Sequence, residues 1–351
     1  MAGLIAGSYG LVQTLLRIPL GILSDRMNKR KLFIILGAFV SVAASVGMFL
    51  IPAPLALLLF RGLSGAAASA WVLYTVLFSS YFKPEDSVKA VGMLNAFNSL
   101  GTLAALCAGG FVAELLGVRY SFVLASVAGV CAMLLGLKTT ESGSSNRKPI
   151  KISDVFSMYR NKELLSVSCI AIVSQYIVFS TAFGFTPVVA RQMGAGSFML
   201  GLLSMVTVLP GLFAPLIAAN FLMQRIGEKK TLVVSFVFAI AGCTALPLSS
   251  NLPTLYASQF IQGIGCTSLY SLLAGLSIKN VESSRRATAM GFFQAVYGIG
   301  MFLGPFVSGV VGNWFGLSAA FYLAGVFGLG GLCSVLVIWR KRAFTHKGAD
   351  E

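Results

Sequence analysis

Charged side chains set inside long apolar runs are the residues of this chain most able to do chemistry. Arg61 lies within the apolar run 54–82, and Arg17 lies within the run 3–23, two residues before Pro19. If these runs cross a membrane, a guanidinium within one of them costs about 2.5–3.5 kcal/mol or more unless it faces other helices. Both arginines are therefore functional candidates, the alternative being that either side chain extends to the membrane interface.

A second charged feature joins the run 3–23 to the run 32–52. This segment contains a glycine (Gly21), an acid (Asp25) and four closely spaced cations: Arg26, Lys29, Arg30 and Lys31. A loop that only anchors the chain at a membrane surface would explain the cations. It would explain neither Gly21 nor Asp25.

The composition excludes a soluble domain. Hydrophobic residues make up 57% of the chain and charged residues 11%, whereas soluble domains carry about 25% charged residues. The net charge of +15 does not indicate nucleic acid, because the cations lie in short loops between apolar runs. The six cysteines lie singly in apolar runs, and we expect no metal, no cofactor and no enzymatic activity.

The apolar runs predict a polytopic helical protein, because backbone groups facing lipid must be paired within a helix. There are eleven such runs, at about 3–23, 32–52, 54–82, 88–116, 119–137, 164–190, 196–224, 231–250, 253–279, 286–314 and 317–339. Of the 26 Lys and Arg residues, 22 fall in alternate loops on one side of the membrane or in the tail. The positive-inside rule places that side, and the C-terminus, in the cytoplasm of a cell-membrane protein.

An internal repeat divides the chain. A shift of 199 residues superimposes Gly110 on Gly309 and Gly117 on Gly316, and it holds without gaps for about a hundred residues. We therefore expect an N-terminal bundle at 1–138, a cytoplasmic linker at 139–163, a C-terminal bundle at 164–342 and a tail at 343–351. The counterpart of the run 164–190 would precede residue 1, so we expect the first bundle to lack one helix, through an internal start or a shortened form.

Three motifs carry a family resemblance. The pattern G-x-L-S-D-R-x-x-K-R-K at 21–31 resembles motif A of the major facilitator superfamily of transporters, and Arg61-x-x-Ser64-Gly65 resembles motif B. The glycines of the runs 88–116 and 286–314 resemble motif C of proton-coupled exporters, although Gly304-Pro305 is intact only in the second half.

The resemblance implies an all-α fold of two pseudo-repeated six-helix bundles, of which eleven helices are present here. It also implies that Asp25, with Gly21, Arg26, Arg30 and Lys31, helps to latch a cytoplasmic gate. Arg61 would take part in proton coupling, and Arg17 in either the latch or the interface. The motif C-like packing residues are Gly101, Gly300, Gly304 and Pro305.

Polar residues within the apolar runs are the candidates for contact with a substrate. They are Tyr74, Asn95, Asn98, Gln175, Tyr176, Gln262, Tyr270, Gln294 and Tyr297. Each of them could instead form a hydrogen bond between helices. Together they predict a mildly polar, aromatic and uncharged cavity.

We therefore expect a monomeric secondary transporter in the lipid bilayer, exporting a small-molecule substrate in exchange for protons. Two alternatives stay open: an importer of a sugar or other neutral metabolite, and a receptor-like protein that does not transport.

Overall fold

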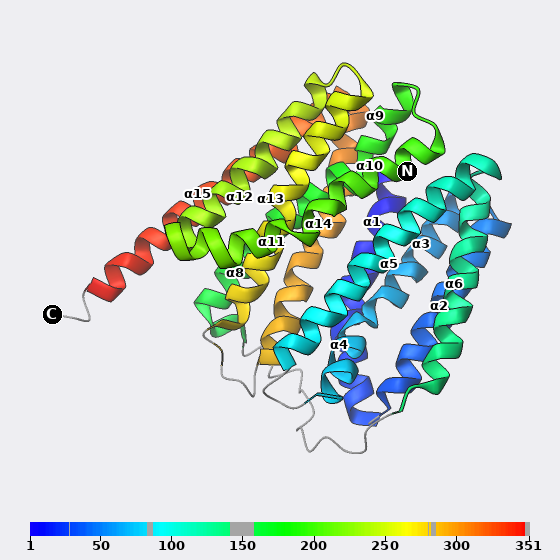
Figure 1. Cartoon of the computed structure of the whole chain (residues 1–351), viewed down its shortest axis with the longest axis horizontal. Coiled ribbons are helices and arrows are strands. Elements are labelled where there is room, and N and C mark those ends of the chain that lie inside the picture. The colour runs from blue at the N-terminus through cyan, green and yellow to red at the C-terminus, as the bar shows by residue number, and fades with distance from the viewer. Residues whose placement is uncertain (28, 83–86, 141–157, 280, 282–285, 348–351) are drawn as a thin grey trace.

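The protein is described here from a computed structural model that covers residues 1–27, 29–82, 87–140, 158–279, 281 and 286–347. Every predicted apolar run is helical within these residues. The helices run roughly along one direction, and the two sets of helices that enclose the central region come from opposite ends of the chain (Figure 1). The linker predicted at 139–163 lies mostly outside the described residues, and α8 begins at Lys162.

The first set consists of six helices. Their bounds are α1 Ala2–Met27, α2 Arg30–Leu50, α3 Pro54–Ser69, α4 Trp71–Ser80, α5 Ser87–Leu115 and α6 Val118–Lys138. The run 54–82 is therefore two helices, because the chain breaks at Ala70 between α3 and α4. In this set α1 packs on α3, and α2 packs on both α3 and α6.

The second set contains longer helices with several irregular turns. The order is α8 Lys162–Ser180, a π-turn at Thr181–Phe185, α9 Thr186–Gln192, α10 Ser197–Val208, α11 Ala214–Ile217, a π-turn at Ala218–Leu222, α12 Met223–Ala245, α13 Leu252–Lys279, α14 Arg286–Phe315 and α15 Leu317–Lys347. Short 3₁₀ turns lie at Met158–Arg160, Leu209–Leu212 and Leu246–Leu248. Prolines account for part of this irregularity, since Pro210 and Pro215 interrupt the run 196–224.

Among the residues that the structure describes, ten helical segments are long and apolar enough to cross a membrane, and α1 is not one of them. α1 carries Gln13 and Arg17 within its length. Its position explains why this is tolerated, because α1 packs between α3 and α14 and is shielded by protein along much of its length.

The repeat is visible in the backbone. Gly117 and Gly316, which the 199-residue shift superimposes, have φ angles of 100° and 84°. Each lies between two long helices, α5 and α6 or α14 and α15. Glycine is needed at both turns because other residues rarely adopt a positive φ. Gly227 has φ 80° in the second half's counterpart of the charged segment, and the helix changes direction there.

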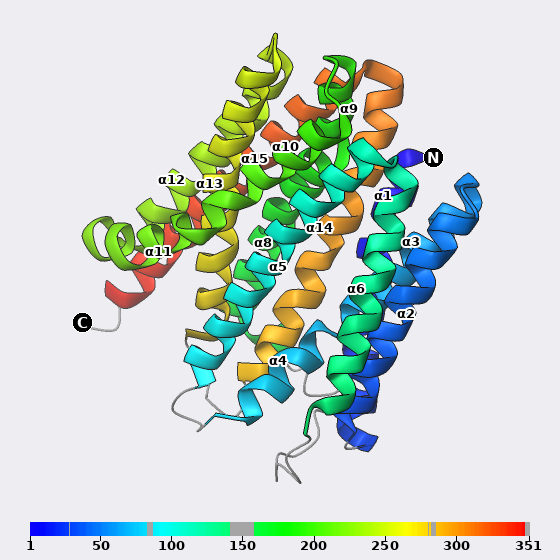
Figure 2. The same ribbon diagram turned by 45° about the vertical axis from the view of Figure 1, so that its right-hand side comes forward.

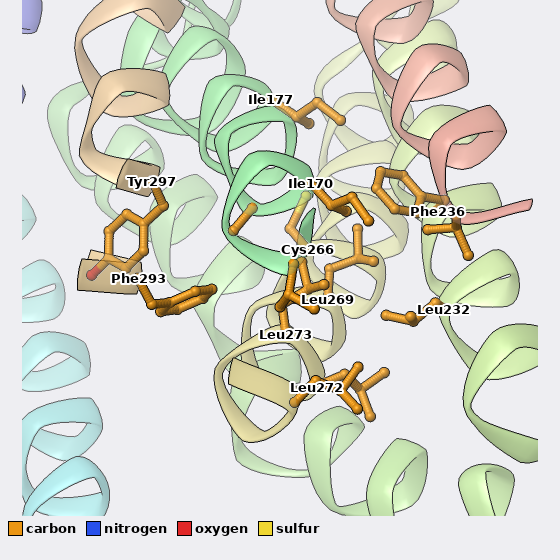
Figure 3. Close-up of a cluster of buried hydrophobic side chains, with 14 of the residues drawn as sticks. Ile170, Ile177, Leu232, Phe236, Cys266, Leu269, Leu272, Leu273, Phe293 and Tyr297 are labelled. Atoms are coloured by element: carbon orange, nitrogen blue, oxygen red, sulfur yellow. The ribbon is translucent and has the colours of Figure 1, made fainter. Parts of the chain in front are cut away.

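The largest core lies within the second set. Side chains from α8, α12, α13 and α14 meet in it, among them Ile177, Phe236, Leu269 and Phe293 (Figure 3). All four are 0% exposed. This core makes α8, α12, α13 and α14 one firm body against which α1 packs.

Candidate functional site

The site begins with a stripe of small residues on α1. Gly3, Gly7, Gly10 and Thr14 recur every three or four residues, which places them on one face of the helix. A Cβ at Gly3 would lie 2.4 Å from the carbonyl oxygen of Pro305, and a Cβ at Gly10 would lie 2.8 Å from the backbone of Met301. Such distances require glycine, so α1 and α14 approach backbone to backbone.

The same contact does not continue to the other end of the two helices. Gly298 of α14 faces Thr14 of α1, but a Cβ at Gly291, two turns earlier on the same face of α14, would have nothing within 4 Å. On α1 the stripe leads through Arg17 to Gly21, where a Cβ would likewise have nothing within 4 Å. The helices therefore touch at the end that carries Gly3 and separate at the end that carries the charged segment.

A second interface repeats this arrangement between α5 and α10. The Cα of Gly201 would lie 3.2 Å from a Cβ at Gly110, so these helices also meet at glycines. Gly110 and Gly309 are equivalent under the repeat, and their partners Gly201 and Gly3 are offset by 198 residues. The two sets of helices thus meet where α1 packs on α14 and where α5 packs on α10 (Figure 2). Both contacts are made at glycines related by the repeat.

Glu114 adds a polar contact to the second interface. Its carboxylate Oε2 accepts a hydrogen bond from the backbone N–H of Phe198, in the first turn of α10, at 3.2 Å. A carboxylate is favourable there because unpaired N–H groups and the helix dipole make a helix N-terminus positive. We refer to the end of the molecule with Gly3, Gly309 and this contact as the closed end.

Arg17 lies at the point where the α1–α14 contact stops. Its side chain is 4% exposed. Its Nη1 donates to the backbone oxygen of Gln294 at 3.5 Å and to the hydroxyl of Tyr297 at 3.3 Å. Arg17 thus bridges the two sets of helices within the described structure, and the alternative that it extends to the membrane interface is wrong.

Arg61 faces α1 from α3. Its guanidinium carbon lies 4.9 Å from the centre of the Tyr9 ring, in the range of a cation–π contact. Tyr9 is also within electrostatic range of Arg17. In the described part of the chain neither arginine forms an ion pair with a carboxylate.

The predicted substrate contacts divide into two groups. Gln294, Tyr297 and Tyr270 come together beside Arg17, and the rings of Tyr270 and Tyr297 are 5.8 Å apart in an edge-on arrangement. The sequence predicted an uncharged cavity from these side chains. In the structure the polar side chains of α13 and α14 at this point lie beside a buried cation from α1, Arg17. Figure 3 shows Tyr297 at the edge of the core.

The remaining candidates lie elsewhere. Gln262 is 1% exposed and links Gln259 to Thr181, while Tyr176 lies 3.4 Å from Ser308 and packs on Phe327. These are contacts between helices of the second set. The others are spread over the structure: Tyr74 is half-buried beside α2, Gln175 is half-buried on α8, Asn98 is exposed on α5, and the side chain of Asn95 lies outside the described residues.

The charged segment is described in part. Asp25 and Arg26 belong to the last turn of α1, but their side chains lie outside the described part of the structure. Arg30 is half-buried at the start of α2, and Lys31 donates to the backbone oxygen of Leu137 at 2.8 Å. Lys31 therefore contacts α6 within its own set of helices, and the predicted latch stays a prediction.

The motif C-like residues serve packing in the second half. A Cβ at Gly300 would lie 2.1 Å from the Ile172 oxygen, and one at Gly304 would lie 2.8 Å from the Tyr176 oxygen. These glycines bring α14 against α8, and Pro305 faces Gly3 of α1. A Cβ at Gly101 in the first half would have nothing within 4 Å, so the two halves differ here as their sequences do.

Sequence reasoning missed the α1 stripe, Tyr9 and the Glu114 contact. The three- or four-residue spacing of Gly3, Gly7, Gly10 and Thr14 was the available signal for a close helix contact. Across the described residues no group of three His, Cys, Asp or Glu side chains could hold a metal ion.

Comparison with known proteins gives the family. The family model of the Major Facilitator Superfamily matches residues 1–218 and 167–350. An uncharacterized MFS-type transporter, MJ1560 of Methanocaldococcus jannaschii, is 24% identical over 336 residues, covering 93% of this chain and 86% of that protein. The multi-drug resistance efflux pump PmrA of Streptococcus pneumoniae is 25% identical over 311 residues, covering 86% of this chain and 77% of the pump.

A solved structure of a transporter has a similar fold. The crystal structure of the nucleoside transporter NupG superimposes with a TM-score of 0.78 at 16% identity, covering 96% of this chain and 90% of that one. This likeness concerns the fold. The chain is a multi-pass membrane protein and belongs to the Major Facilitator Superfamily of transporters.

Proposed function

We propose that this chain is a secondary active transporter that exports a small molecule across the cell membrane by alternating access, in exchange for protons. The observation that carries the proposal is the stripe shared by α1 and α14. It is in backbone contact at Gly3 and Gly10 and separated at Gly21 and Gly291. Two rigid bodies joined at one end can expose a central site to one side of the membrane at a time.

The orientation follows from the cations. The opposite end, where α1 and α14 separate at Gly21 and Gly291, is the open end. It carries the charged segment that begins at Gly21, and the positive-inside rule puts these cations in the cytoplasm. On this argument the site faces the cytoplasm in the present structure, and the C-terminus is cytoplasmic too.

Export and proton exchange rest on similarity. PmrA is named as an efflux pump, and the glycine pattern of α14 resembles motif C of proton-coupled exporters. Import of a sugar or other neutral metabolite is the second candidate, because the first half has Ala105-Leu106 where the second has Gly304-Pro305.

The test is flux through the reconstituted full chain in liposomes with an acidic lumen. We expect a substrate of an exporter, added outside, to be taken up saturably while protons leave, so that a trapped pH dye reports alkalinisation. A protonophore should abolish this uptake. Sugar uptake that is indifferent to the pH gradient would support the importer, and saturable binding without any flux would support a receptor-like protein.

A further inference from the structure

Two buried polar atoms at the contact between α1 and α14 have no hydrogen-bond partner in the described structure. They are the Nε of Arg17 and the side-chain oxygen of Gln294. The two residues are 4% and 7% exposed. Buried polar atoms are nearly always paired in folded proteins, and leaving one unpaired costs about 1–3 kcal/mol. Arg17 contacts the backbone of Gln294, so the two unpaired atoms belong to neighbouring residues, and together they point to a ligand.

The charge of this region has one sign. Arg17 lies here, and Arg61 lies on the other side of Tyr9. The helices that pack around them are α1, α3, α13 and α14, and their sequences contain a single acid, Asp25, two turns beyond Arg17. The ion pair recorded among the described residues, Lys279 with Glu228, is elsewhere. A buried cation without a counter-charge is costly, so the missing group is an anion.

An aromatic surface adjoins the guanidinium of Arg17. Tyr297 contacts it directly, with the guanidinium carbon 5.8 Å from the ring centre. Tyr270 and Phe293 lie edge-on to Tyr297 at 5.8 and 5.3 Å. Tyr297 is 6% exposed whereas Tyr270 is 37% exposed, so one ring stays accessible next to a buried cation. Aromatic groups pack well in such an edge-on arrangement.

We propose that Arg17 binds the carboxylate of a small aromatic organic anion, whose ring packs against Tyr270 and Tyr297, and that this anion is the transported substrate. The unpaired edge of the guanidinium, which includes Nε, suits a carboxylate because both are planar and can form paired hydrogen bonds. Arg61 adds positive charge from behind Tyr9. The unpaired side-chain oxygen of Gln294 can accept a hydrogen bond from a hydroxyl or amino substituent. The identification of the anion as cargo rests on the proposed transport function; the binding site does not.

Binding to the purified full chain tests the site without requiring transport. Titration calorimetry in chloride-free buffer would compare benzoate with benzamide, which is nearly isosteric but neutral, with acetate, which is charged but lacks the ring, and with chloride. We expect saturable benzoate binding at least tenfold tighter than each of the other three. Benzamide lacks the charge-assisted hydrogen bond, which is worth about tenfold to a hundredfold in affinity, and acetate and chloride lack the ring that packs on Tyr270 and Tyr297. Benzamide binding as tightly as benzoate would overturn the proposal, and so would chloride or acetate binding as tightly.

Matched variants locate the binding. Arg17→Gln should weaken benzoate binding by about tenfold to a hundredfold, whereas Arg191→Gln, an exposed arginine of α9, should leave it unchanged. Arg17→Lys, which keeps the charge and protects against misfolding, should give an intermediate loss. Tyr270→Leu, at an accessible position, should remove the preference for benzoate over acetate. Unchanged benzoate binding in Arg17→Gln and Arg17→Lys would refute the assignment.

The experiments distinguish a failure of the anion-site proposal from a failure of the transporter proposal. If benzoate does not bind but the two ends of α1 and α14 still open and close in turn, the anion site is wrong and the transporter proposal stands. If benzoate binds but liposome flux is absent for every probe, the transporter proposal fails and the site remains.

Discussion

Gly10→Ala is the perturbation that addresses the α1–α14 interface most simply. A methyl group at this position would lie 2.8 Å from both the carbonyl carbon and the Cβ of Met301, where ordinary contact begins at 3.4 Å. The helices must therefore separate by about 0.6 Å, and the obstacle is partly backbone, which cannot rotate away. Overpacking of this kind costs about 1–3 kcal/mol.

Gly10→Ala raises the free energy of the conformation seen here, in which Gly10 contacts Met301. A conformation in which α1 and α14 have separated at this end lacks that contact, so the substitution destabilises it less. A difference of about 1–3 kcal/mol shifts a two-state equilibrium by about 5-fold to 150-fold. We therefore expect Gly10→Ala to increase the population of the conformation in which α1 and α14 separate near Gly3 and Gly309.

The assay is the distance between spin labels at Leu4 of α1 and Val310 of α14, both exposed and next to the Gly3–Gly309 contact. The labels require a cysteine-free background, because Cys107, Cys131, Cys169 and Cys333 are exposed. The expected result is a longer distance population that grows in Gly10→Ala. Gly330→Ala is the control, since its Cβ would meet open space on α15 and the change tests only the effect of alanine on a helix. An unchanged distance distribution in Gly10→Ala would show that the Gly10–Met301 contact does not hold this end closed.

Three further predictions concern single contacts. Glu114→Gln should weaken the hydrogen bond to the first turn of α10 by about 0.3–1 kcal/mol. The distribution of distances between spin labels at Leu115 and Met199 should broaden, and an unchanged width would argue that the carboxylate does not hold α5 against α10. Gln262→Leu should lower the free energy of unfolding by about 1–3 kcal/mol, because it leaves the buried side-chain nitrogen of Gln259 without its acceptor and removes the donor to the Thr181 hydroxyl. Thermal unfolding measures this, with exposed Asn98→Ala as the unaffected control. Tyr9→Leu should cost about 0.5–2 kcal/mol through the lost ring under Arg61 while Tyr9→Phe keeps the ring, so equal melting temperatures for the two variants would contradict the cation–π contact.

Much of the fold could be predicted from the sequence. The apolar runs and the 199-residue repeat sufficed for the helices and the two bundles, because backbone pairing in lipid leaves few alternatives. The breaks at Ala70 and around Phe213 were not predicted, since a helix interruption inside an apolar run depends on what packs beside it.

The site was predictable residue by residue but not as an arrangement. Arg17 and Tyr297 were singled out separately, yet 280 positions of sequence separate them and no spacing rule brings them together. Gln262 looked the same in sequence as Gln294, and only packing places one in a network within the second set and the other beside Arg17. Gly3, Gly7 and Gly10 were overlooked because a glycine stripe indicates a close contact without naming the partner helix.

The central claim is that α1 and α14 act as a single rocking contact whose two ends open in turn. It is tested most directly by measuring both ends of the same protein in lipid nanodiscs, with spin labels at Leu4 and Val310 in one sample and at Met27 and Met290 in the other. As Gly10→Ala lengthens the first distance, we expect the second distance to shorten, because the gap at Gly21 and Gly291 closes. A first distance that lengthens while the second stays fixed would mean local fraying of α1, and it would contradict alternating access through this interface.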